Sequence, residues 1–147
     1  MNVTKAERKN HAWFALADAE ACRLLSCSLT QRGMPHVVEH DMIRHTAAIH
    51  EHARPMTNAG MTHDVEEEER RFAGEIIKWL QGQAGVNKIE ELVLFAPPRM
   101  LGVLRMAPLG SLKGRVEEIK GDLMPLNAGQ LADHPMIREL IGTARES

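Results

Sequence analysis

The junction between an apolar run and two prolines in the second half of the chain constrains the fold most strongly. Residues 92–95 read Leu-Val-Leu-Phe, which is typical of a buried strand. Pro97 and Pro98 stop this strand, and Arg99 stands near the amino end of the helix that the following residues predict. Because free N–H groups at a helix start favour anions, a strand that runs directly into a helix indicates a ligand-binding edge.

The remainder of the sequence predicts one domain with a mixed sheet. The chain has 147 residues, enough for one sizeable core, and its 44% apolar and 26% charged residues are a globular balance. Periodicity predicts strands at 13–17, 21–28, 36–43 and 92–95, and helices from 64 to 82–85, from 99, at 127–134 and at 135–144. We therefore expect a single three-layer α/β domain over residues 11–143, in the order βββαβαβα, after an N-terminal extension of residues 1–10.

Some boundaries rest on local signals. Asp64 and Glu67 have the spacing of a capping box, which predicts that the long helix begins at Asp64. Residues 44–63 show no clean period, so we expect a long loop, a type of segment that is usually functional or disordered. Residues 115–120 fit either a strand or a continuing helix. The strand at 36–43 carries several charges and is expected at a sheet edge.

The composition narrows the class of protein. The apolar runs fall short of the roughly 20 residues that a membrane helix needs, and residues 12–17 are too few for a secretory signal. We therefore expect a cytoplasmic protein with no membrane partner. Cys22 and Cys27 lie in one expected strand and project to opposite faces, so they cannot easily pair with each other. The formal net charge of −2 offers no broad surface for nucleic acid, and no cofactor is expected because no nucleotide-binding glycine pattern is present.

One positive cluster is the main candidate site. It consists of Arg99, Arg105, Lys113 and Arg115. These residues bracket the edge at which the fourth expected strand ends, and Asp18 joins them if the first and fourth strands are adjacent and parallel. A phosphate-bearing ligand or an RNA backbone could use Arg99 as a fork-shaped donor. The alternative is structural, with Arg99 paired with Asp18 or bonded to nearby carbonyls.

Histidines in the expected loop raise a second possibility, metal binding. The loop candidates are His45, His50, His52, Asn58, Gly60 and His63, of which His50, His52 and His63 are candidate metal ligands. Imidazole suits zinc, but no pair has the i, i+4 spacing of a metalloprotease helix. A metal-dependent nuclease would also need Asp18 and one of residues 66–69, and no acid follows residues 92–95 to complete its carboxylates. A solvated polar loop is the simpler interpretation.

Four segments follow the patterns of one known family. Residues 96–102 read Ala-Pro-Pro-Arg-Met-Leu-Gly, 13–25 place Ala-Asp at a hairpin turn, 69–76 contain Phe-Ala-x-x-Ile, and 116–126 contain Lys-Gly-Asp-Leu. These segments resemble the host attachment protein family, a bacterial branch of the archaeo-eukaryotic release factor superfamily, whose pattern has no glycine at Gly121. The resemblance implies a fold like the release-factor central domain, whose topology is close to that of ribonuclease H.

The resemblance also implies a role in translation, with one departure. In the release factors, a Gly-Gly-Gln loop between the third strand and the long helix hydrolyses the peptidyl-tRNA ester. The corresponding residues 44–63 contain no glutamine. We therefore expect a non-catalytic or cryptically catalytic binding module at the ribosome or tRNA. The alternatives are a metal-dependent hydrolase or nuclease, and a protein–protein adaptor that uses the exposed edge of the strand at 36–43.

Overall fold

The core of the protein is a five-stranded mixed sheet. The computed structural model describes residues 10–45 and 58–141, with side chains from residue 65 onward in the second range. The strands are β1 (His11–Ala17), β2 (Ala21–Leu29), β3 (Pro35–Arg44), β4 (Leu92–Ala96) and β5 (Val116–Lys120). Their order in the sheet is β3-β2-β1-β4-β5, in which β2 is antiparallel to β1 and β3 while β1, β4 and β5 are parallel. The mixed sheet and the edge position of β3 are therefore confirmed.

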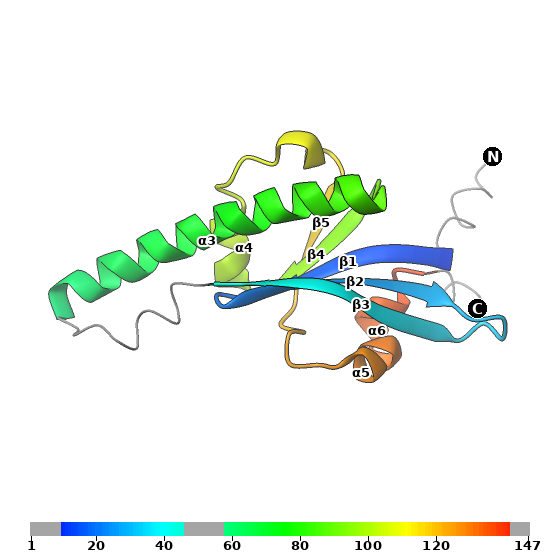
Figure 1. Cartoon of the computed structure of the whole chain (residues 1–147). Coiled ribbons are helices and arrows are strands. Elements are labelled where there is room, and N and C mark those ends of the chain that lie inside the picture. The colour runs from blue at the N-terminus through cyan, green and yellow to red at the C-terminus, as the bar shows by residue number, and fades with distance from the viewer. Residues whose placement is uncertain (1–9, 46–57, 142–147) are drawn as a thin grey trace.

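Helices cover both faces of the sheet, as the three-layer prediction requires (Figure 1). They are α3 (Asn58–Asn87), α4 (Pro98–Leu104), the 3-10 helix η3 (Gly110–Leu112), α5 (Ala128–Asp133) and α6 (Pro135–Arg138). One face carries α3 and α4, and the other carries α5 and α6. Among these described helices, none combines the length and apolarity that crossing a bilayer requires.

The central strand β1 is buried on both faces because its side chains alternate between two cores. Ala15 packs with the side chains of α3 and α4, whereas Phe14 packs with those of α5 and α6, and both are fully buried. Cys22 and Cys27 divide between the same two cores, which confirms that they project to opposite faces. Burial raises the pKa of both thiols, with the Asp18 charge adding to the shift at Cys22, so both are protonated and unreactive at neutral pH.

A buried arginine links the sheet to the segment that precedes α5, on the face that carries α5 and α6. Arg23 of β2 is only 8% exposed. Its Nε and one terminal nitrogen donate to the two carboxylate oxygens of Glu39 in β3, at 2.9 and 2.8 Å. The other terminal nitrogen donates to the carbonyls of Met124 and Leu126, at 2.8 and 2.9 Å. One side chain therefore joins β2, β3 and the segment that leads to α5.

Several predicted boundaries shift. Helix α3 begins at Asn58 rather than Asp64, because capping-box spacing also occurs inside a longer helix. It also continues through Gly82 and Gly85 and ends at Asn87. The apolar face of α3 is buried against the sheet, and this burial outweighs the weak helix propensity of glycine. The expected loop at 44–63 is wrong at Arg44, which is the last residue of β3, and from residue 58 onward, where α3 begins.

The structure also shows which predicted elements form in the carboxyl-terminal part of the chain. Residues 115–120 contain strand β5, which resolves the open alternative in favour of a strand. Asn127 caps α5 as predicted, and Gln130 completes the reciprocal capping box. The helix expected at 135–144 is the shorter α6, followed by hydrogen-bonded turns up to Ile141. The predicted extension at 1–10 lies outside the described residues except for Asn10.

Replacing Lys88 by glycine should stabilise the protein. Lys88 directly follows α3 and has φ +55°, and it is the one non-glycine residue with positive φ in the described part of the chain. A side chain in this left-handed region is strained, so Lys88→Gly should raise the free energy of unfolding by about 0.5–1 kcal/mol, measured by urea denaturation. Lys78→Gly, at an exposed position inside α3, is the matched control and should lower it by about 1 kcal/mol. A loss of stability in both variants would contradict this account.

Candidate functional site

Strand register brings the ends of several elements to one edge of the sheet. Leu16 of β1 lies beside Phe95 of β4, and Ala96 lies beside Lys120 of β5, so the parallel strands end together. This confirms that β1 and β4 are adjacent and parallel, and it places Asp18 and Arg99 at the same edge. We call this the carboxyl edge and define it by Asp18, His45, Glu68, Glu69 and Arg99.

Arg99 forms an ion pair at the carboxyl edge, but not with the partner that the sequence suggested. One terminal nitrogen of Arg99 lies 3.1 Å from Oε1 of Glu69 in α3. The carboxylate of Asp18 accepts from the backbone N–H groups of Glu20 and Ala21, at 2.8 and 2.9 Å, as a turn aspartate does. The pairing of Arg99 with Asp18 is therefore wrong, because the carboxylate of Asp18 closes the β1–β2 hairpin.

His45 connects the end of β3 to α3. Its backbone N–H donates to the carbonyl of Glu20 at 2.8 Å, and its ring stacks on Phe72 with centroids 4.7 Å apart. Its Nε2 lies 3.4 Å from Oε1 of Glu68, whose other oxygen lies 3.3 Å from Arg71. The side chain of His45 is 11% exposed, so it is packed against α3 rather than solvated in a loop.

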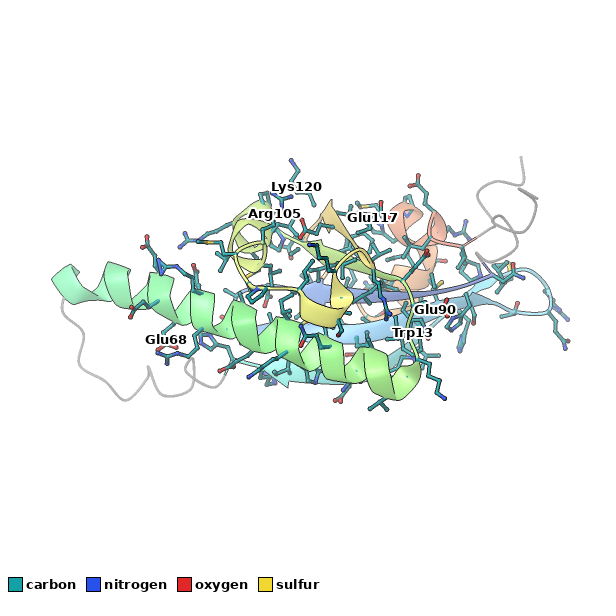
Figure 2. The ribbon with its side chains drawn as sticks, turned by 90° about the horizontal axis from the view of Figure 1, so that it is seen from above. Trp13, Glu68, Glu90, Arg105, Glu117 and Lys120 are labelled. Atoms are coloured by element: carbon teal, nitrogen blue, oxygen red, sulfur yellow. The ribbon has the colours of Figure 1, made fainter. Side chains whose placement is uncertain are left out.

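Arg105 lies on the outer flank of the sheet, beside β5. Its Nε donates to Oε1 of Glu118 at 2.7 Å. Lys120 lies two residues further along β5, on the same face as Glu118, and Figure 2 shows Arg105 and Lys120 on the same side of the molecule. Lys120 was missed as a site residue in the sequence, although the alternation of residues 116, 118 and 120 in a strand would have indicated it.

Lys113 and Arg115 do not belong to this cluster. Val116 lies beside Leu92, and the N–H of Leu92 donates to the carbonyl of Arg115, so both cations lie where β4 and β5 begin. The expectation of one four-residue positive cluster is therefore wrong. The physical reason is the crossover: α4 and η3 return the chain along the full length of the parallel strands before β5 starts.

The other histidine candidates do not form a described metal site. His50 and His52 lie outside the described residues, and Asn58, Gly60 and His63 belong to the backbone of α3 rather than to a loop. Within the ranges that the structure describes, no group of three or more histidine, cysteine, aspartate or glutamate side chains is arranged to hold a metal ion.

Comparison with known proteins assigns the chain to a family. A search of the curated proteins finds no match. Among solved structures, the Ppx/GppA family member from Aquifex aeolicus is similar over 75% of this chain and 35% of its own, with 14% identity and a TM-score of 0.36. The chain thus spans about a third of that protein, and so remote a likeness carries no argument about function. Residues 13–134, a range that contains every residue of the carboxyl edge, match the family described as "Protein required for attachment to host cells". The chain belongs to this family.

Proposed function

We propose that this member of the family is a binding module for RNA phosphate groups, at the ribosome or on tRNA in the cytoplasm, and that it acts by binding rather than by catalysis. The observation that carries the proposal concerns two ion pairs. In the pair Arg99–Glu69 the side chains are 69% and 15% exposed, and in Arg105–Glu118 they are 62% and 24% exposed. In both pairs the arginine is the outer partner, so an approaching molecule meets the guanidinium first.

The paired carboxylates position the arginines without using all their donors. A guanidinium has five N–H donors in a fixed fork, which matches the geometry of phosphate. Arg99 uses a terminal nitrogen toward Glu69, and Arg105 uses Nε toward Glu118, so other donors remain on each side chain. Because the carboxylates already restrict the two side chains, less conformational entropy is lost when a phosphate binds.

Helix α3 favours a large partner over a small one. Its amino-terminal part projects beyond the carboxyl edge, as Figure 1 shows. Arg70 and Arg71 are exposed on this helix close to Glu69, the partner of Arg99. A macromolecule bound at Arg99 would therefore also contact α3, whose exposed charged residues here are Glu66, Glu67, Arg70 and Arg71. The adaptor role of edge strand β3 stays a prediction, and no described cluster of ligands favours the metal-dependent hydrolase.

The proposal is tested with two double variants that remove the same charge from two different places on the molecule, the first from the carboxyl edge and the outer flank and the second from the start of β4 and β5. The variants are Arg99→Ala with Arg105→Ala, and Lys113→Ala with Arg115→Ala. The first should weaken binding to purified tRNA or purified ribosomes by about tenfold in low salt, and should lower the salt slope of log Kd by about 1–2. Filter binding at several salt concentrations measures both quantities.

The control variant separates a local site from general charge. Lys113→Ala with Arg115→Ala should retain the affinity within about twofold, because those cations lie where β4 and β5 begin, away from the carboxyl edge. Arg99→Lys should lower the affinity for RNA less than the Arg99/Arg105 double variant does, since lysine keeps the charge but not the fork-shaped set of donors. Equal losses of affinity in the two double variants would show that binding depends on the net charge and not on a local site. Undetectable binding by the unmodified protein would refute the proposal.

A further inference from the structure

A pocket of about 730 Å³ lies at the opposite end of the sheet from Arg99. Its walls come from the start of β1, the segment that leads into β4, strand β5 and the residues around α6. Parallel register explains this convergence, because Trp13 lies beside Leu92, which in turn lies beside Val116. Figure 2 labels Trp13, Glu90 and Glu117, which belong to three different walls.

The pocket wraps around the start of the strands, so its aliphatic and aromatic parts lie on opposite faces of the sheet, the first with the α5 and α6 core and the second with the α3 and α4 core. Val93, Ile119 and Leu140 are half-buried and supply aliphatic surface from β4, β5 and the end of α6. The indole of Trp13 is half-buried and is held in place by two imidazoles, with ring centroids 5.6 Å away for His11 and 4.5 Å away for His40. The volume of the pocket lies within the range of roughly 300–1,000 Å³ that is common for ligand-binding sites.

The rim of the pocket is strongly acidic. It carries Glu90, Glu91, Glu117 and Glu139, all exposed, against the single lysine Lys88. These four carboxylates form no hydrogen bond or ion pair with another side chain in the parts of the protein that are described. Carboxylates and apolar side chains line the same pocket, so it is complementary to cations that are carried on an apolar frame.

We propose that this pocket binds a basic, amphipathic peptide segment of a partner protein, in which arginine or lysine side chains alternate with apolar ones. In an extended segment, alternate side chains point to opposite sides, so apolar ones can meet the aliphatic part of the pocket while cations reach the glutamates of the rim. Four carboxylates on three separate segments suit several spaced cations better than one small ion.

Peptide binding at this pocket is independent of the proposed RNA-binding function. The pocket and Arg99 lie at opposite ends of the parallel strands, and no residue is shared between the two sites. Loss of one activity should therefore leave the other intact.

The test uses Trp13 as a reporter. The chain has two tryptophans, so Trp79→Phe leaves Trp13 as the sole indole. The probe is an amidated hexapeptide of alternating leucine and arginine, labelled with fluorescein, and binding is followed both by probe anisotropy and by Trp13 emission. We expect saturable binding that changes Trp13 emission, and at least about a tenfold weaker Kd when the four rim glutamates are replaced by glutamine.

A matched variant controls for net charge and for folding. It replaces Glu20, Glu66, Glu67 and Glu75 by glutamine, and it should keep the affinity within about twofold. Circular dichroism verifies that both variants are folded. The proposal is overturned if the peptide does not bind, if it binds without changing Trp13 emission, or if both variants weaken equally. It is also overturned if a leucine–glutamate peptide or spermine binds as tightly as the basic peptide.

Discussion

Replacing Arg23 by methionine should lower the free energy of unfolding by about 3 kcal/mol. Arg23 is 8% exposed and donates to Glu39 and to the carbonyls of Met124 and Leu126. Methionine fills much of the same volume but leaves these acceptors without a donor. Because the Glu39 side chain is 38% exposed and can regain water, we place the loss at the lower end of the range for a broken buried ion pair.

Urea denaturation of three variants measures this effect. Arg23→Lys should lose less than Arg23→Met, since an ammonium group retains charge but cannot bond Glu39 with two parallel N–H groups. Arg32→Met, at an exposed position in the β2–β3 turn, should change the free energy of unfolding by no more than about 0.5 kcal/mol. A loss below about 1 kcal/mol for Arg23→Met would show that this buried network is not important for stability.

Replacing Phe72 by alanine should have a similarly large effect, a loss of about 4 kcal/mol. Phe72 is fully buried in the core between α3 and the sheet, and its ring stacks on His45 at 4.7 Å. Truncation leaves a cavity in the core and removes the surface against which the end of β3 packs. The carboxyl edge should therefore loosen as well, because Glu68 and Glu69 lie on the adjacent turn of α3.

The same denaturation assay separates volume from position. Phe72→Leu keeps most of the buried surface and should lose about 1–1.5 kcal/mol. Val86→Ala, also on α3 but 79% exposed, should stay within about 0.5 kcal/mol of the unmodified protein. If Phe72→Ala and Val86→Ala proved equally stable, the assignment of Phe72 to the core would be wrong.

Much of the architecture could be predicted because its signals are local. Alternation and apolar runs identified four of the five strands and left residues 115–120 open between a strand and a helix. The prolines at 97 and 98 identified the turn into α4. Periodicity does not encode which strands are neighbours, so it could not predict the order of the strands in the sheet. The start of α3 was missed because a capping motif at Asp64 is not an obligatory helix boundary.

The contacts of the candidate site could not be predicted, since the residues that contact one another are distant in sequence. Arg99 and Glu69 are 30 residues apart, and the carbonyls that Arg23 bonds are 101 and 103 residues away from it. No local sequence pattern predicts such contacts. Lys113 and Arg115 were grouped with Arg99 because they are close in sequence, whereas the crossover to β5 separates them in space.

The most direct test of the RNA-binding proposal is recovery of RNA with the tagged protein from a bacterial lysate in low salt. Ribosomal RNA and tRNA would be quantified for the unmodified protein and for the two double variants, at Arg99 with Arg105 and at Lys113 with Arg115. We expect RNA recovery with the unmodified protein and the Lys113/Arg115 variant, and about tenfold less with the Arg99/Arg105 variant. RNA at the level of an untagged control, or equal amounts with all three proteins, would contradict the proposal.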